Sequence, residues 1–289
     1  MKKKLIVMGL VSIMTMSIVA CGKDENLSSN ETTSVITTDG GSEESSTEEN
    51  TTEKETNVTD ELTDEYLLSL PETPSEQFRY EEVEGGIKIT SCRLDSDRDM
   101  IVVIPNQIEG KDVIELDNEL FVRDRFKAVV LNKNLKMTSG GLFFDAEIEK
   151  VVMQEGLEII GGRTFYYAET GDIKIPNTVK IIEGTAFGDS NIKEITIPKN
   201  VETIMTAAFS LCHELETVTF EGCPNIENGA FTMSENIKKI ICLDGNISFY
   251  KDEFYTLSGE PVDITFVAPA GSEVEKYAKE NGFKFEALN

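Results

Sequence analysis

The sequence of 289 residues is poor in histidine and in positive charge, and it has no tryptophan. With one histidine, it cannot form a metal site from several histidines and has little capacity for general-base catalysis near neutral pH. Lys and Arg total 27 against 53 Asp and Glu, which gives a formal net charge of −26. Such a chain repels the phosphate backbone of nucleic acids, so we expect no nucleic-acid partner; we also expect no cofactor.

An uncharged apolar run extends from Leu5 to Ala20 and follows three lysines at positions 2–4. This layout is typical of a secretory signal peptide, and the run is short for a stable membrane span. The run ends in Ile18-Val19-Ala20-Cys21, which resembles the lipobox of bacterial lipoproteins. The resemblance implies cleavage before Cys21 and acylation of Cys21, which would attach the protein to a lipid bilayer. The alternative is an ordinary signal peptide that ends near a cysteine.

Residues 22–66 contain few apolar side chains. The segment holds 14 Asp and Glu and two Lys among many Ser, Thr and Asn residues. Burial of so little apolar surface cannot offset the conformational entropy of the chain, so we predict a disordered linker that its like charges extend. The sequence therefore divides into a signal peptide at 1–21, an acidic linker at 22–66 and a folded domain at 67–289.

The folded part repeats with a period of 22 residues. Phenylalanine recurs at this spacing, and an apolar residue lies eight positions before each one. The phenylalanines are Phe121, Phe143, Phe165, Phe187, Phe209 and Phe231. The residues eight positions earlier are Val113, Leu135, Leu157, Val179, Val201 and Cys223. Columns that stay in phase over six cycles indicate a repeat architecture.

A short strand pattern lies upstream of each phenylalanine. In Ile195-Thr196-Ile197 the two outer side chains would point into a core and the middle one outward. Pro198 then ends the strand, since proline cannot donate to a β-ladder. A period of 20–29 residues with one strand per repeat is typical of a leucine-rich-repeat solenoid. One repeat cannot bury enough apolar surface to fold alone, so neighbouring repeats must stack.

The segment from Ile195 to Ile204, followed by Ala208-Phe209, resembles the BspA-type leucine-rich repeats of bacterial surface proteins. Ile104-Pro105 with residues 108–113 resembles the first repeat of that family. The resemblance covers about residues 80–289. It implies a right-handed solenoid with a parallel concave sheet of one short strand per repeat, and an adhesive or protein-binding role. The sequence departs from the pattern at Thr138 and Thr164, and the repeat after Phe231 is degenerate.

Both ends of a solenoid need covers, because stacking leaves apolar edges bare there. We therefore divide the domain into an N-terminal cap with the first repeat at 67–112, phased repeats at 113–235, and a degenerate repeat with a C-terminal cap at 236–289. Tyr80–Thr90 and Met100–Ile104 predict an N-terminal β-hairpin cap. Tyr66–Leu70 predicts a short helix.

A helix cap is expected at the C-terminus. Ser272 and Glu275 form the S-x-x-E pattern of a capping box, and Gly282 is placed to stop the helix. Its apolar face would consist of Val274, Tyr277 and Ala278. Phe283 and Phe285 would add a final strand.

Two short motifs resemble sites of known chemistry. Asp95-Ser96-Asp97-Arg98-Asp99 imitates the start of a calcium loop but has Met100 where the loop needs glycine, so a solvated turn is the better interpretation. Cys212-His213 places the only histidine beside a thiol, which could serve nucleophilic catalysis. Neighbouring side chains on an extended loop diverge, however, and Cys212 occupies a repeat position that serine holds elsewhere.

Three other cysteines fall at apolar positions of the pattern, where cysteine behaves as a small hydrophobe. They are Cys92, Cys223 and Cys242. A Cys223–Cys242 disulfide is possible outside a cell, but buried free thiols are favoured.

The outward strand positions are the best candidates for a ligand-binding face. Stacking at this period aligns them in two columns. The first holds Val130, Val152, Lys174, Thr196, Thr219 and Ile241, and the second holds Ala128, Lys150, Asp172, Glu194, Thr217 and Lys239. Solenoids bind extended partners on such faces. The alternative is a solvated face without a ligand. A continuous apolar or one-signed stripe would favour binding, and scattered polar residues would favour a scaffold.

Together these features predict a non-enzymatic lipoprotein, anchored by lipid to the bacterial cell membrane on its outer side, whose solenoid binds a protein or another macromolecule. A structural or scaffold component of the envelope, with no external ligand, is the alternative. An enzyme would depend on Cys212-His213 alone. A solute-binding lipoprotein is disfavoured because it needs two α/β lobes instead of a 22-residue period. The oligomeric state is left open.

Overall fold

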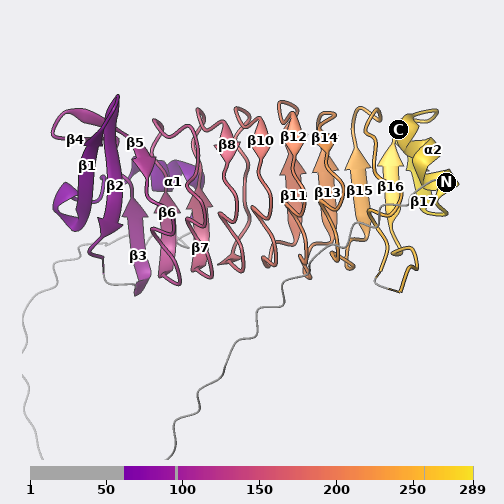
Figure 1. Ribbon diagram of the computed structural model, residues 1–289, viewed down its shortest axis with the longest axis horizontal. Coiled ribbons are helices and arrows are strands. Elements are labelled where there is room, and N and C mark those ends of the chain that lie inside the picture. Colours follow the sequence, from indigo (N-terminus) through magenta and orange to yellow (C-terminus); the bar gives the residue numbers. More distant parts are fainter. Residues whose placement is uncertain (1–61, 95–96, 257, 289) are drawn as a thin grey trace, which may run out of the picture. The chain divides into compact units, whose positions relative to one another are not determined.

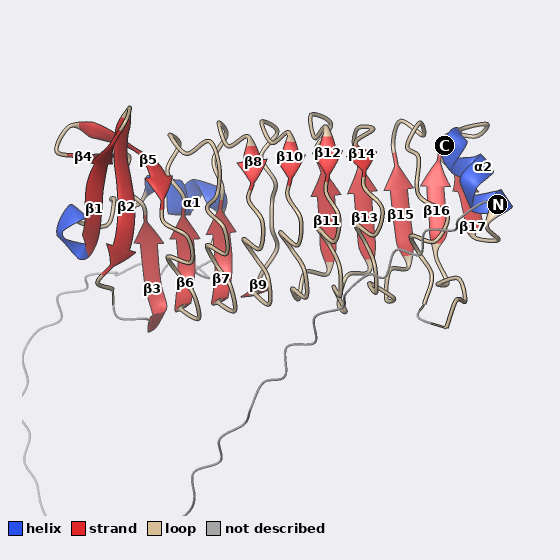
Figure 2. Ribbon diagram, viewed as in Figure 1, coloured by secondary structure: helices blue, strands red, loops and turns tan. Residues whose placement is uncertain are grey.

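The computed structural model describes residues 62–94, 97–256 and 258–288. These residues form a parallel β-solenoid of about nine turns with little helix (Figures 1 and 2). The lipobox cysteine and nearly all of the acidic linker lie outside the described residues, as do Asp95 and Ser96 of the calcium-like motif. Within the described ranges, neither helix is long and apolar enough to cross a bilayer.

The described turns carry two rows of parallel strands. The longer strands form one sheet, here called the long-strand sheet, in two parts. The first part has the order β3 (Asp97–Val103), β6 (Arg125–Val130), β7 (Glu147–Val152) and β9 (Glu169–Thr170). The second has the order β11 (Glu194–Ile197), β13 (Thr217–Phe220), β15 (Lys239–Cys242), β16 (Thr265–Ala268) and β17 (Lys284–Ala287).

The second row of strands, here called the short-strand sheet, has two residues in each strand. It comprises β8 (Ile159–Ile160), β10 (Ile181–Ile182), β12 (Thr203–Ile204) and β14 (Asn225–Ile226). Each pairing joins residues 22 positions apart, such as Ile181 with Thr203. The repeat period is thus the length of one turn.

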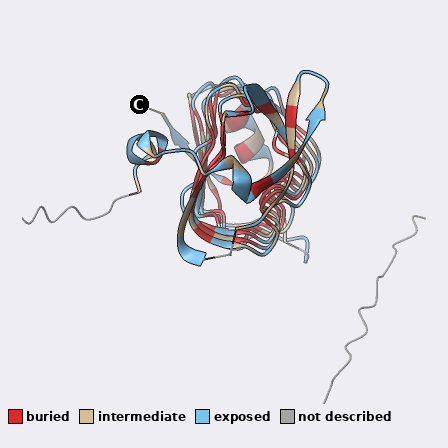
Figure 3. Ribbon diagram, turned by 90° about the vertical axis from the view of Figure 1, so that its left-hand side faces the viewer, coloured by how far each residue is buried: buried red, intermediate tan, exposed pale blue. Residues whose placement is uncertain are grey.

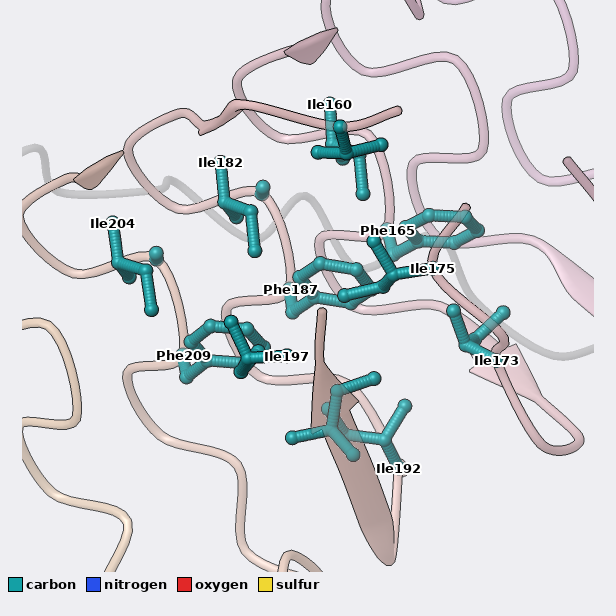
Figure 4. Close-up of a cluster of buried hydrophobic side chains, with 14 of the residues drawn as sticks. Ile160, Phe165, Ile173, Ile175, Ile182, Phe187, Ile192, Ile197, Ile204 and Phe209 are labelled. Carbon is teal, nitrogen blue, oxygen red and sulfur yellow. The ribbon is translucent and has the colours of Figure 1, made fainter. Parts of the chain in front are cut away.

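The phenylalanine column forms a continuous stack inside the solenoid (Figure 4). Ring centroids of Phe165, Phe187 and Phe209 follow one another at 5.0 Å, with the ring planes 13° and 4° apart. Viewed along the axis, the turns superpose, and buried residues recur around them (Figure 3). Each ring is in contact with the turn before and the turn after, so the predicted stacking of repeats is confirmed.

The two threonines that depart from the repeat pattern satisfy each other. The hydroxyl groups of Thr138 and Thr164, both fully buried, are 2.7 Å apart. The Gly161 N–H donates to Thr138 Oγ1 at 2.8 Å, and Thr164 Oγ1 donates to the Gly161 carbonyl at 2.6 Å. Because a buried polar group is costly only when it has no partner, the pair is accommodated in the core.

The N-terminal strands differ from the predicted hairpin. β1 (Phe78–Val83) and β2 (Gly86–Cys92) pair antiparallel and form a hairpin. Tyr80–Thr90, which was expected to supply one strand of the hairpin, thus contains parts of both strands and the turn. Gly85 makes the turn possible, since its φ of +94° disfavours other residues. Met100–Val103 belongs instead to β3, which pairs parallel with β6. β2 pairs with β5 (Lys111–Leu116), and β5 with β4 (Gln107–Ile108).

Helix α1 (Asp64–Ser69) lies near the predicted short helix and begins inside the segment that we assigned to the linker. Thr63 is its N-cap and accepts a hydrogen bond from the Tyr66 N–H at 3.1 Å. Asp64 and Glu65 in the first turn favour the helix electrostatically. Leu70, the residue before Pro71, is extended and ends the helix. A 3₁₀ turn (Ser75–Gln77) leads into β1.

At the other end, α2 (Glu273–Glu280) packs beside β16 and β17 (Figure 1). Ser272 Oγ accepts from the Glu275 N–H at 3.2 Å, as the capping pattern predicts. The helix ends at Asn281, and Gly282 follows with a φ of +79°. Phe266, Tyr277 and Phe283 form an aromatic cluster with centroid distances of 5.4–5.9 Å.

Candidate functional site

The two predicted columns lie side by side on the outer face of the long-strand sheet, here called the strand face. The parallel registers place Thr196 beside Thr219, and Thr219 beside Ile241. They likewise place Glu194 beside Thr217, and Thr217 beside Lys239. The strand face thus presents one ladder of side chains over β11, β13 and β15.

Part of the strand face is covered by α1. Val130 and Val152 were expected to point to solvent, but only 1% and 4% of their surfaces are exposed, and Ala128 is fully buried. They form a cluster with Leu67 of α1. Val130 and Val152 are therefore not open to an external ligand while α1 is docked, which corrects their assignment as binding residues. A helix held by contacts distant in the sequence leaves no trace in the repeat pattern.

Asp64 of α1 marks the edge of the covered part. Its carboxylate oxygens lie 3.3 Å from Lys150 Nζ and 3.9 Å from Lys174 Nζ. Lys150, a residue of β7, is half-buried beside α1, whereas Lys174 is mostly exposed. Lys174 is thus the first residue of the column that lies beyond α1.

The uncovered part of the strand face lies between Lys174 and β15. Its predicted residues are Asp172, Lys174, Glu194, Thr196, Thr217, Thr219, Lys239 and Ile241, all of which are exposed or half-buried. Two acidic and two basic side chains are mixed with threonines, so there is no continuous apolar or one-signed stripe. Scattered polar residues of this kind favour a scaffold over a ligand-binding stripe.

A hollow of about 430 Å³ lies in the uncovered part, where the two parts of the long-strand sheet meet. Asp172, Lys174, Glu194 and Thr196 line it together with Glu221. The segment 171–175 is not a strand, although Ile173 and Ile175 are buried like the corresponding residues of the next turn, Ile195 and Ile197. The sheet is thus interrupted at the place where the predicted binding residues are most exposed.

Cys212-His213 is not arranged for nucleophilic catalysis. Cys212 is fully buried, and its Sγ lies 3.0 Å from the Phe187 carbonyl oxygen, to which the thiol donates. Burial raises the pKa of the Cys212 thiol to about 11, so the thiolate is scarce at neutral pH. His213 lies on the exposed surface. The adjacent pair in sequence therefore diverges, as expected.

The remaining cysteines of the described domain are free. Cys242 is buried, as predicted, and burial raises the pKa of its thiol to about 12. Cys223 is exposed, so its assignment to the core is wrong. The loop here has one residue fewer between Phe220 and Ile226 than between Ile197 and Ile204, and Pro224 is buried instead. Cys92 is half-buried.

Among the described residues, no group of three or more His, Cys, Asp or Glu side chains could hold a metal ion. Of the calcium-like motif, Asp97, Arg98 and Asp99 lie in β3. Arg98 forms an ion pair with Glu147, and Asp97 accepts from the Asp99 N–H.

One further surface was missed, on the outer side of the short-strand sheet. Met137, with 40% of its surface exposed, lies beside Ile159, and Ile159 lies beside Ile181; both isoleucines are partly exposed. Glu158 and Lys180, the residues before the two isoleucines, form an ion pair at 2.7 Å and line a hollow of about 820 Å³. The sequence did contain a signal for this surface. Met137, Ile159 and Ile181 are apolar residues that recur every 22 positions, and Ile159 and Ile181 directly precede the buried Ile160 and Ile182.

Comparison with solved structures finds the same fold in bacterial proteins. The leucine-rich repeat protein of T. pallidum aligns with a TM-score of 0.55 at 21% identity, over 75% of this chain and 98% of its own. A leucine-rich repeat protein of Bacteroides ovatus aligns with a TM-score of 0.50 at 23% identity, over 67% of this chain and 58% of its own. No curated protein matches the sequence.

A sequence family is matched over the solenoid. The family described as BspA type leucine rich repeat region matches six copies, within residues 106–170 and 136–260. These residues include the phenylalanine stack and most of both parallel sheets. The chain belongs to the BspA-type leucine-rich repeat family.

Proposed function

We propose that this protein is a non-enzymatic, lipid-anchored surface module that binds a protein or another macromolecule through the uncovered part of the strand face. Leucine-rich repeats are commonly involved in protein binding, and BspA-type proteins are typically bacterial surface proteins. The anchor would be acylated Cys21, and the acidic linker would hold the solenoid away from the bilayer.

The observation that carries the proposal is the ladder of exposed strand residues beside the 430 Å³ hollow. Stacked turns hold this ladder rigidly, so an extended partner could contact successive strands without ordering the surface first. Because Lys174 and Glu194 lie close together at the hollow, a partner with both charges would be complementary to it.

The test uses the full chain to capture partners by chemical crosslinking at the bacterial surface. Lys174→Glu and Thr196→Glu should each reduce capture at least tenfold, because they place new negative charge in the hollow. Lys133→Glu and Thr232→Glu are matched controls at exposed positions away from the strand face and should leave capture unchanged. Capture that survives both strand-face changes would place the binding site elsewhere.

A scaffold without an external ligand is the second candidate, and the mixed charge of the uncovered part favours it. Deletion of the protein should then weaken the envelope, measured as sensitivity to detergent, while adhesion stays unchanged. Full rescue of the envelope by Lys174→Glu/Thr196→Glu would support this role. Loss of adhesion on deletion would contradict it.

A further inference from the structure

The surface beneath α1 is an apolar patch on the outside of the long-strand sheet. It consists of Val103, Ala128, Val130 and Val152, with Ile101 half-buried beside them. These side chains cluster with Leu67 and are separate from the core cluster that fills the solenoid. The interior is therefore complete without α1, and removal of the helix would expose the patch without opening the core.

α1 is held on the patch by few contacts. Leu67 is fully buried, and Leu62 and Leu70 are partly buried against the patch. Tyr66 and Leu68 remain 44% and 49% exposed. A helix of six residues is unstable alone in water, so α1 depends on this docking to remain helical.

The chain that follows α1 is fixed independently of it. The Thr73 N–H donates to the Val103 carbonyl at 2.9 Å, and the Val103 N–H donates to Thr73 Oγ1 at 2.9 Å. The backbone N–H of Asn106 donates to Glu72 Oε1 at 3.0 Å. Undocking can therefore stop at residues 70–71, and the solenoid keeps its first strands in place.

We propose that this patch is a second interaction site, for a short leucine-containing helix with an acidic first turn, and that α1 occupies it in cis. The partner chemistry is read from α1 itself. Leu67 enters the apolar centre, while Asp64 lies between Lys150 and Lys174. A partner helix with the same pattern competes with α1 for this surface, and it displaces α1 only when its affinity outweighs the effective concentration of the covalently linked helix. The site borders the uncovered part of the strand face and shares Lys174 with it.

The test measures binding of a labelled synthetic peptide, Leu62–Glu72, to the full chain by fluorescence anisotropy. Leu67→Asp in the chain expels α1 because it would bury an unpaired carboxylate. We expect this variant to bind the peptide at least tenfold more tightly than the unaltered chain does. Leu68→Asp is the matched control, since Leu68 is exposed on the same helix, and it should bind no better than the unaltered chain.

Two further variants guard against an indirect effect. Asp64→Lys in the chain repels Lys150 and Lys174 without disturbing the apolar centre, and it should also increase peptide binding. Val130→Glu, added to either opening variant, should abolish it. Unchanged circular dichroism would verify that each solenoid is folded. Folded Leu67→Asp and Asp64→Lys chains that bind the peptide no better than the unaltered chain would overturn the proposal.

Discussion

The side chain of Phe187 lies between Phe165 and Phe209, with ring centroids 5.0 Å away on either side. It is fully buried, and its ring lies nearly parallel to both neighbours. Six successive turns each supply one ring to this stack, from Phe121 to Phe231, so Phe187 joins three turns of the solenoid. We therefore expect each of these six rings to contribute strongly to stability.

Phe187→Ala should lower the free energy of unfolding by about 3–5 kcal/mol, because it removes a buried ring and leaves a cavity between two others. The measurement is the urea unfolding curve of the full chain. Met137→Ala is a suitable control, since Met137 lies on the surface, and it should cost well under about 1 kcal/mol. Equal losses for the two variants would mean that the stack is not the main source of stability.

At the scale of elements, the chain between β15 and β16 continues the stack where the repeat pattern ends, since the ring centroid of Phe254 lies 5.9 Å from that of Phe231. In the phased turns, backbone N–H groups near each stacked phenylalanine donate hydrogen bonds to backbone carbonyls of the next turn. The Ala207 and Phe209 N–H groups, for example, donate to the Gly229 and Ala230 carbonyls. For the Gly229 and Phe231 N–H groups the acceptors are the carboxyl oxygens of Glu253, at 2.9 and 2.7 Å. One side chain thus replaces two backbone carbonyls.

Glu253→Gln should lower the free energy of unfolding by about 1–3 kcal/mol at acid pH. The amide would place an NH₂ group where the Gly229 or the Phe231 N–H needs an acceptor. Burial raises the pKa of the Glu253 carboxyl above its ordinary value. The Glu253 carboxyl therefore stays protonated to higher pH in the folded protein than in the unfolded chain. Stability from this group is full below the unfolded pKa and falls as pH rises toward the folded pKa.

The advantage of the unaltered chain over Glu253→Gln should therefore shrink as pH rises from about 4 to 8. Urea midpoints across this range are the measurement. Asp252→Asn, at an exposed neighbour, is the control for general charge effects. A difference that stays constant with pH would show that Glu253 does not titrate in this range.

At the scale of the whole molecule, each turn contacts mainly its two neighbours. Backbone hydrogen bonds join residues 21–23 positions apart along the solenoid, as in the Phe187 N–H bond to the Ala208 carbonyl. Stability is then approximately the sum of individual turns and the interfaces between them. A whole turn should be removable, whereas half a turn should not.

Deletion of residues 179–200 removes one period and joins Thr178 to Val201, which keeps every column in phase. We expect a folded protein of lower urea midpoint, because Phe165 can stack on Phe209. Deletion of residues 190–200 removes half a period and should prevent folding of the C-terminal turns. Circular dichroism and gel filtration compare the two. If the two deletion variants fold equally well or equally poorly, the turns do not need to stack in register.

The sequence by itself determined the period and most of the strands and inward residues of the phased turns, because each turn repeats the same local pattern and neighbouring turns must align to bury it. It also indicated α2, because the N-cap residue Ser272 and Glu275 form a local sequence pattern. Tertiary structure alone decided that α1 docks on Val130 and Val152, that Glu253 replaces two carbonyls, and that Cys223 is exposed. The first two depend on segments outside the repeat period, for which no column predicts a partner. The exposure of Cys223 depends on how the chain accommodates the shorter loop between Phe220 and Ile226.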